Sequence, residues 1–141
     1  DEMYPLLVKH WKEIGLYTDK VILDPNWEKY EAYENIGALH ILTARDNGKL
    51  VGYSVNLVSP ALHYQDSLYA VNDVLYLHED YRNAKVGYRM LKFSEDYFKR
   101  LGCHVMTIHM KVYLPFDGLC EGLGFDYAER LYTKYIGGDC V

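Results

Sequence analysis

Three basic side chains and one glycine gather where an apolar segment gives way to an amphipathic one: Arg82, Lys85, Gly87 and Arg89. A glycine between the end of a strand and the start of a helix lets backbone N–H groups approach a phosphate. The helix dipole adds about half a positive charge at the same place. Together with the basic residues, this segment predicts a site for a polyanion such as a pyrophosphate. A strand–turn–helix with a purely structural glycine is the alternative.

Two helices are expected before any strand. Residues 4–14 have apolar positions at helical spacing before Gly15. Asp24 and Pro25 then supply an N-cap and a first-turn proline for a second helix, which runs to Ile36. Later in the chain, a helix that follows Gly87 should end at Gly102, and Pro115 should open a short helix.

The expected strands combine β-branched and aromatic residues with flanking turn signals; they are residues 39–44, 50–58, 69–77, 105–110 and, near the end, 125–136. Asn47-Gly48 favours a tight hairpin between the first two strands. Residues 60–67 should form a loop before the third strand, and the fourth strand should run parallel to the third through a crossover helix. The pattern predicts an α/β domain with a mixed, mostly antiparallel sheet flanked by helices.

The segment Glu-Asp-Tyr-Arg-x-x-x-Val-Gly-x-x-Met-Leu around Gly87 resembles the acetyl-CoA pyrophosphate loop of the GNAT N-acetyltransferase superfamily, usually Arg/Gln-x-x-Gly-x-Gly/Ala. Lys85 replaces the first glycine of that motif. Residues 119–125, Leu-Cys-Glu-Gly-Leu-Gly-Phe, are similar to the family's Leu-Tyr-Glu-Lys-Leu-Gly-Phe. The resemblance covers residues 39–136 and implies a single GNAT-type acyl-CoA N-acyltransferase domain over residues 1–141, with splayed parallel central strands. Residues 62–82 also resemble acetyltransferases carried by tailed bacteriophages.

The resemblance implies acetyl-CoA (coenzyme A) as co-substrate, lying in the gap between the splayed strands. GNAT relatives take the backbone donors for the developing oxyanion from the strand before the phosphate loop, which corresponds to residues 75–77 here. The residues expected to bind acetyl-CoA are Leu75, Tyr76, Leu77, Arg82, Asn83, Ala84, Lys85, Val86, Gly87 and Tyr88.

An amine acceptor of pKa about 10.4 is mostly protonated at neutral pH, so a base, or a water chain leading to one, must take its proton. Asp73 is the first candidate, because strand alternation places it on one face with Leu75 and Leu77, where apolar surroundings would raise its pKa. A hydrogen-bonded strand aspartate is the alternative. Glu79, at the end of the strand, is the second candidate, and a solvated turn carboxylate is its alternative.

Cys120 occupies the position where the family usually has a tyrosine that protonates the departing thiolate. A thiol of pKa near 8.5 could still donate a proton, and a thiolate leaves readily without much help. Packing of Cys120 within a helix is the alternative. Tyr113 and Tyr132 are candidate replacements for the missing acid. Leu114 is a second departure, because many relatives have an asparagine there.

Four residues are expected to line the acceptor pocket: Glu34, His63, Tyr64 and His109. Glu34 would do so if its helix caps the cleft. The expected acceptor is a primary amine, either on a small molecule such as a polyamine or an aminoglycoside, or on a protein lysine or N-terminus. No two histidines have His-x-x-x-His spacing, so no metal is expected.

Composition excludes several classes of function. A formal charge of −5 over 141 residues disfavours nonspecific nucleic-acid binding. No apolar run approaches the ~20 residues of a membrane span, and the first residues lack a secretory signal. Cys103, Cys120 and Cys140 are odd in number and lack Cys-x-x-Cys spacing, which favours a reducing cytoplasm, that of the host if the protein is phage-encoded. A homodimer is compatible with the sequence.

These observations predict an N-acetyltransferase in which the amine attacks acetyl-CoA directly within a ternary complex. Covalent catalysis through Cys120 is disfavoured, because no partner histidine is identifiable. The alternative function is that of a catalytically impaired GNAT-fold module that binds acyl-CoA or a protein partner. Lys85, Leu114 and Cys120 are the features that favour this alternative.

Overall fold

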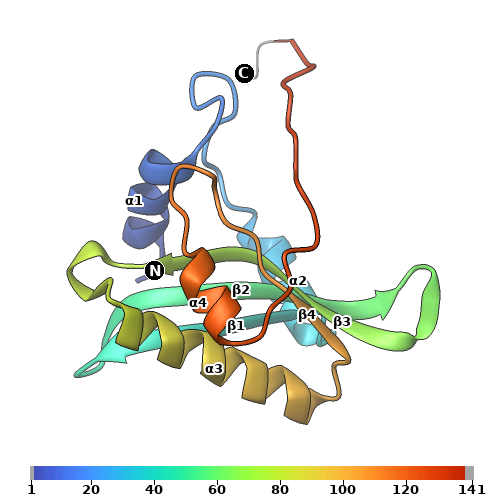
Figure 1. The fold of residues 1–141 in the computed structure, drawn as a ribbon. Helices are drawn as coiled ribbons and strands as arrows, with labels where there is room; N and C mark the ends of the chain where they lie inside the picture. The colour runs from blue at the N-terminus through green and yellow to red at the C-terminus, as the bar shows by residue number, and fades with distance from the viewer. Residues whose placement is uncertain (1, 139–141) are drawn as a thin grey trace.

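The computed structural model describes residues 2–138 of the chain. Its helices are α1 (Tyr4–Ile14), α2 (Trp27–Asn35), α3 (Ala84–Leu101) and α4 (Asp117–Gly122), and a 3-10 turn, η1, spans Glu79–Tyr81. Its strands are β1 (Leu39–Asp46), β2 (Lys49–Ala61), β3 (Tyr64–Leu77) and β4 (Val105–Thr107). Figure 1 shows α1 and α2 on one side of the sheet and α3 on the other.

The sheet has the order β1-β2-β3-β4, with antiparallel pairing except between β3 and β4, which run parallel. The expected α/β fold with a mixed, mostly antiparallel sheet is therefore confirmed. The β1–β2 hairpin turns at Asn47 and Gly48, whose φ angles of 49° and 83° are those that an Asn-Gly turn favours.

The prediction of a loop at residues 60–67 is wrong. β2 continues to Ala61 and β3 begins at Tyr64, so only Leu62 and His63 lie between the strands. Pro60 stays within the ladder, opposite Leu68, because the register shifts directly after it, and a proline is tolerated where a bulge relaxes the pairing.

A β-bulge divides β3 into two halves. The register with β2 shifts between Val55 and Asn56, and Asp73 is the extra residue on β3. The buried Asn72 stabilises this irregularity, because its side-chain amide donates to the carbonyl oxygen of Val74 across the bulge at 3.1 Å. The same amide donates to Oδ1 of Asn56 on the neighbouring strand, also at 3.1 Å.

The bulge changes which residues face which layer, because one extra residue reverses the alternation of side chains. Before it, Ala70 packs with Phe98 of α3. After it, Tyr76 packs in the core that lies beneath α1 and α2. The buried residues of this core are Met3, Leu6, Leu7, Leu39, Leu50, Tyr53, Val55 and Tyr76. The expectation that Asp73 shares an apolar face with Leu75 and Leu77 is therefore wrong, and Asp73 is exposed.

Helix boundaries differ from the expected ones where a better cap lies nearby. The N-cap of α2 is Asn26 rather than Asp24, with its side chain accepting from the Lys29 N–H at 3.0 Å. Helix α3 begins at Ala84, before Gly87, because the Asn83 side chain accepts from the Val86 N–H at 3.0 Å. The expected end of α3 at Gly102, with φ of 97°, is confirmed.

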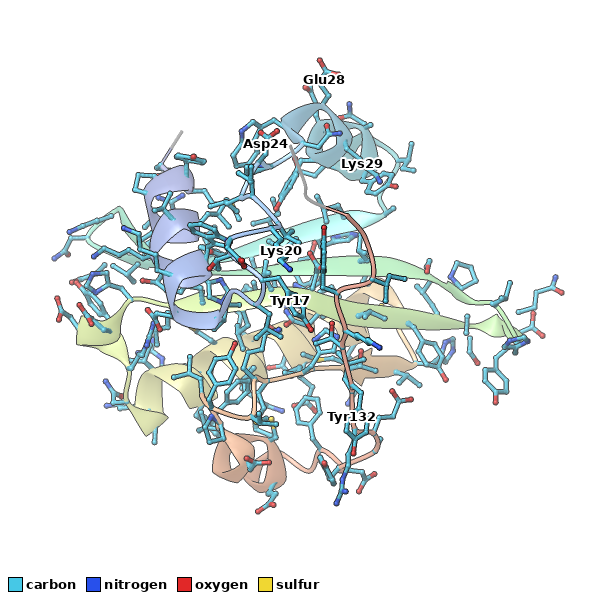
Figure 2. The ribbon with its side chains drawn as sticks, turned by 90° about the horizontal axis from the view of Figure 1, so that it is seen from above. Tyr17, Lys20, Asp24, Glu28, Lys29 and Tyr132 are labelled. Atoms are coloured by element: carbon cyan, nitrogen blue, oxygen red, sulfur yellow. The ribbon has the colours of Figure 1, made fainter. Side chains whose placement is uncertain are left out.

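The terminal strands expected at residues 125–136 are absent from this part of the described chain, and β4 stops at Thr107 rather than at residue 110. A three-residue edge strand offers a further strand few hydrogen-bonding groups. The terminal segment instead contacts the α1–α2 connection, where the ring of Tyr135 lies 5.9 Å from that of Tyr17 and 5.0 Å from Nζ of Lys20. Figure 2 shows Tyr17 and Lys20 on that connection and Tyr132 on the terminal segment, well away from Glu28 and Lys29 of α2.

Two further observations concern the expectations from composition. No helix within residues 2–138 has the length and apolarity that crossing a membrane requires. Cys103 and Cys120 are free thiols, and Cys140 lies outside the described residues.

Candidate active site

The parallel strands β3 and β4 separate after three paired positions. Tyr69 is opposite Val105, and the ladder ends where Val71 is opposite Thr107. Beyond that point, residues 72–77 of β3 have no strand partner on this side among residues 2–138. The expected splay of the parallel strands is therefore present, and it leaves an open backbone edge.

Backbone groups of β3 point into this opening at alternate residues. The N–H of His78 donates to the Val51 carbonyl of β2 at 2.7 Å, so the peptide groups of Leu77 and Leu75 face the opposite way. The carbonyl of Leu77 accepts from Nε of Arg82 at 2.6 Å. The N–H groups of Leu75 and Leu77 therefore face the side on which β4 has turned away.

A pocket of about 330 Å³ lies beside this edge, between β3, the first half of α3 and the segment that leads into α4. Its lining is mostly apolar and consists of His10, Leu75, Tyr76, Leu77, Arg82, Asn83, Ala84, Gly87, Met90, Leu91, Leu114, Pro115, Phe116 and Leu119. We call it the edge pocket.

Most of the residues expected to bind acetyl-CoA meet in the edge pocket: Leu75, Tyr76, Leu77, Arg82, Asn83, Ala84 and Gly87. Lys85, Val86 and Tyr88 belong to the same first turns of α3 but are outside the lining. The end of β3 and the segment around Gly87 thus lie together, as the sequence pattern implies.

Arg82 is held in place by two acceptors. Its Nη2 lies 2.7 Å from Oε1 of Glu13 on α1, and its Nε donates to the Leu77 carbonyl. The hydrogen bond from Arg82 lowers the pKa of Glu13, and the same bond raises the pKa of the guanidinium. Arg82 therefore links α1 to the end of β3. Lys85 and Arg89 are exposed basic residues of α3.

Gly87 is favoured by close packing rather than by an unusual backbone. A Cβ at this position would lie 2.7 Å from Cδ1 of Leu119 on α4. Both residues line the edge pocket. The glycine therefore lets α4 approach α3 and shapes the wall of the pocket.

The two carboxylates considered as bases, Asp73 and Glu79, and the acceptor-pocket candidate Glu34 lie outside the edge-pocket lining. Asp73 lines a smaller pocket with Tyr30 and Tyr33 of α2. Burial raises the pKa of Tyr30, and the charge of Asp73 adds to that effect. Glu79, in the first position of η1, and Glu34, on α2, are exposed.

Cys120 is half-buried on α4, next to the pocket residue Leu119 but not itself in the lining. Burial raises the pKa of its thiol, and the neighbouring acidic side chains add to this effect. The two tyrosines considered in its place are engaged or remote: the hydroxyl of Tyr113 donates to the Ile14 carbonyl at 2.5 Å, and Tyr132 is 87% exposed.

The histidines expected in the acceptor pocket are distant from the edge pocket or outside it. His63 and Tyr64 lie at the β2–β3 turn, and β3 then runs 14 residues to Leu77, about 40 Å at the usual rise. Figure 1 shows this turn and the connection from β3 to α3 at opposite ends of the sheet. His109, after β4, is exposed.

The sequence reasoning missed His10. This α1 residue is 6% exposed and lines the edge pocket, with Nδ1 3.2 Å from the hydroxyl of Tyr53 and its ring 5.1 Å from that of Tyr76. Burial lowers its pKa to about 4, so the imidazole is neutral at pH 7. The available signal was a histidine within the apolar stripe that contains Leu6 and Leu7, a pattern that packing alone also explains.

Comparison with known proteins gives one family. The sequence model described as the acetyltransferase (GNAT) family matches residues 3–121. No curated protein sequence matches the chain. Residues 2–138 contain no group of three or more His, Cys, Asp or Glu side chains that could hold a metal ion.

Solved structures share the fold at low identity. A ribosomal-protein-alanine N-acetyltransferase from Brucella melitensis biovar Abortus 2308 has 20% identity and a TM-score of 0.68, with 96% of this chain and 91% of that chain covered. An aminoglycoside acetyltransferase from an uncultured soil metagenomic sample, in complex with sisomicin, has 11% identity and a TM-score of 0.70, with 97% and 86% covered. Glucosamine-6-phosphate N-acetyltransferase from Arabidopsis thaliana has 15% identity and a TM-score of 0.63, with 79% and 74% covered.

Proposed function

Because the chain belongs to the acetyltransferase (GNAT) family, we propose that it transfers the acetyl group of acetyl-CoA to the nitrogen of a primary amine. The observation that carries this proposal is the edge pocket, where an open strand edge, an apolar cavity and the start of an 18-residue helix meet. Acetyl-CoA supplies an acyl thioester, a carbonyl activated toward attack by nitrogen.

The residues of the edge pocket fit this co-substrate. The N–H groups of Leu75 and Leu77, which face away from β2, suit the amide groups of a pantetheine arm, as an additional strand would. Met90 and Leu91 offer apolar surface to the same arm. The first turn of α3 offers backbone N–H groups and a positive dipole end to the pyrophosphate, and the exposed Lys85 adds charge.

We propose a role for Arg82 that differs from the expected binding of the pyrophosphate. Because Glu13 and the Leu77 carbonyl already bind its guanidinium, we propose that Arg82 mainly shapes the connection from β3 to α3. Substitution of Arg82 should therefore act on acetyl-CoA affinity through the position of that connection, in addition to any loss of charge.

Acetyl transfer forms a nitrogen–carbon bond and breaks a carbon–sulfur bond, giving an N-acetyl amine and the thiol of CoA. The amine must lose a proton, and Asp73 and Glu79 are the carboxylates we propose to accept it. Both are exposed and outside the edge pocket, so water would connect them to the amine. If Asp73→Asn and Glu79→Gln each keep full kcat and an unchanged pH profile, neither carboxylate is the base.

We propose that the acceptor approaches from the α2 side of the sheet. The pocket formed there by Tyr30, Tyr33 and Asp73 combines aromatic faces with a carboxylate, a combination that suits a cationic amine. The acceptor class stays broad: a small-molecule amine, a protein lysine or a protein N-terminus. Glu34, His63, Tyr64 and His109 stay predictions for its recognition, as do the homodimer, the cytoplasmic location and the phage origin.

The alternative is a GNAT-fold module that binds acyl-CoA or a protein without turnover. Lys85, Leu114 and Cys120 favour it, as does the engagement of Arg82 by Glu13. The two functions are separated by mixing the protein with acetyl-CoA and a panel of primary amines and measuring free CoA thiol. Amine-dependent thiol release supports the enzyme. Binding of acetyl-CoA without release from any amine supports the module.

A control variant makes that assay specific to the edge pocket. Gly87→Trp would fill the space between α3 and Leu119 and should abolish release. Gly118→Trp is the matched control and should keep it, because a Cβ at Gly118 of α4 would point into open space.

A further inference from the structure

His10 is a buried titratable side chain of the edge-pocket lining, and the proposed reaction leaves it without a role. Helix α1 presents it toward the open edge of β3, between the ring of Tyr76 and the hydroxyl of Tyr53. A polar group in such a place has both a defined partner on one side and a cavity on the other. Its two ring nitrogens therefore have different roles.

The Tyr53 hydroxyl defines which nitrogen carries the hydrogen. Tyr53 is fully buried, and burial raises its pKa, so the hydroxyl keeps its proton. Within residues 2–138, the hydroxyl has one hydrogen-bond partner, Nδ1 of His10 at 3.2 Å. If Nδ1 carried a hydrogen, the hydroxyl hydrogen would have no acceptor in the core, an unfavourable arrangement. Tyr53 therefore donates, Nδ1 accepts, and the imidazole hydrogen is on Nε2.

Nε2 opens onto the edge pocket. Within the described part of the chain, Nε2 has no hydrogen-bond partner. Every fully buried side-chain nitrogen or oxygen there does have a partner, so Nε2 must be accessible from a cavity or from solvent. Because His10 belongs to the pocket lining, its exposed Nε2 edge faces the cavity. The pocket lining thus offers a side-chain N–H donor in addition to the backbone N–H groups of Leu75 and Leu77.

Nearby charges leave His10 neutral at pH 7. Burial is the main cause of the lowered pKa of His10; Glu13 on the same helix opposes it, whereas Arg82 and Lys111 reinforce it. Tyr53 and Tyr76 face the ring from the two strands as uncharged groups. A neutral imidazole in a desolvated wall can stabilise negative charge that develops next to it, as other preorganised donors do.

We propose that His10 is a catalytic residue whose Nε2–H donates a hydrogen bond to the thioester carbonyl oxygen of acetyl-CoA as negative charge develops there. This inference rests on the proposed function. His10 keeps its hydrogen throughout: nitrogen–carbon bond formation, carbon–sulfur bond breakage and loss of the amine proton occur without proton transfer through the imidazole. The imidazole thus complements the backbone donors of β3.

The first test reads the imidazole directly, by nitrogen NMR of protein with labelled histidines, assigned with His10→Gln. His10 should be a neutral Nε2–H tautomer from about pH 5.5 to 8, whereas an exposed histidine titrates in that range. Adding acetyl-CoA without an amine should shift its Nε2–H resonance. A neutral Nδ1–H tautomer, an imidazolium at pH 7, or an unchanged resonance in protein saturated with acetyl-CoA would each overturn the proposal.

The second test separates a catalytic role from a structural one. His10→Leu should lower kcat about 100-fold with a small change in the KM for acetyl-CoA. His10→Gln restores an N–H donor, so its kcat should be at least about a tenth of that of the original protein. His104→Leu, at an exposed histidine beside the paired end of β4, is the matched control. A folded His10→Leu protein with kcat within about threefold of the original would overturn the proposal.

These outcomes also distinguish failure of the inference from failure of the proposed function. An original protein that neither binds acetyl-CoA nor releases thiol contradicts the proposed function, and the inference falls with it. An active original protein with an unaffected His10→Leu variant contradicts the inference alone. If His10→Leu does not fold, the NMR measurement and the kcat of His10→Gln decide.

Discussion

Replacing Gly87 with alanine has two opposing effects on the free energy of unfolding, and the structure allows their sizes to be compared. Gly87 is in the first turns of α3, and its φ is not among the positive values of the described chain. An alanine in a helix is about 0.5–1 kcal/mol more stable than a glycine. Its Cβ, however, would lie 2.7 Å from Cδ1 of Leu119.

The contact can be relieved, because Cδ1 is the end of a flexible side chain and Leu119 is only half-buried. Rotating Leu119 away from its preferred rotamer costs about 0.5–1.5 kcal/mol, so the two effects nearly cancel. We expect the free energy of unfolding of Gly87→Ala to stay within about 1 kcal/mol of the original. We expect the displaced Leu119 side chain to occupy part of the edge pocket, which it already lines.

Acetyl-CoA affinity should therefore fall by at least about tenfold, or ~1.4 kcal/mol, in a protein of nearly unchanged stability. Calorimetric titration and thermal unfolding measure the two quantities. Truncating the displaced side chain in Gly87→Ala/Leu119→Ala should recover most of the affinity, whereas Gly118→Ala, in open space on α4, should bind normally. Unchanged affinity in Gly87→Ala, combined with the full helix stabilisation, would show that the Gly87–Leu119 contact does not shape the binding site.

Three further substitutions test other parts of the molecule. Glu13→Gln should lower the free energy of unfolding by about 0.5–1 kcal/mol near pH 7, because the Arg82 ion pair is about one-third exposed. Since that pair lowers the folded-state pKa of Glu13, the stability difference between the two proteins should be complete above the unfolded pKa of about 4.3. It should disappear as the pH falls through the lower folded-state pKa. A stability difference that does not change with pH in urea unfolding would contradict this prediction. Asn72→Ala should cost about 1–3 kcal/mol, measured in the same way, because the bond to the Val74 carbonyl across the bulge is lost; a cost near zero would mean that the bulge is stable without it. Cys120→Ala should lower kcat by less than about tenfold, and a hundredfold loss at an unchanged melting temperature would instead make the thiol catalytic.

Local chemistry explains the parts of the fold that the sequence predicted. The Asn47-Gly48 turn and the end of α3 at Gly102 depend on backbone conformations that few other residues adopt, so their positions are visible in the sequence. The association of β3 with the start of α3 follows from the order of elements around Gly87. The general location of the site was predictable for that reason.

The features that were not predictable depend on contacts between distant residues. The bulge at Asp73 depends on the Asn72 side chain and its partners on β2, and it reverses a face that simple alternation would assign. His10 gains its place in the edge pocket only when α1 packs beside the open end of β3. The terminal segment had a strand-like composition, but β4 ends after three residues and offers it little edge.

Binding of acetyl-CoA in the edge pocket, along the open half of β3 and over the start of α3, underlies both the proposed function and the role of His10. Amide hydrogen exchange with and without acetyl-CoA tests this binding mode directly, because the proposed contacts are backbone N–H groups. We expect slower exchange at Leu75, Leu77, Ala84 and Lys85, with little change at the β2–β3 turn. Saturating acetyl-CoA that protects other segments while leaving these amides unchanged would contradict it.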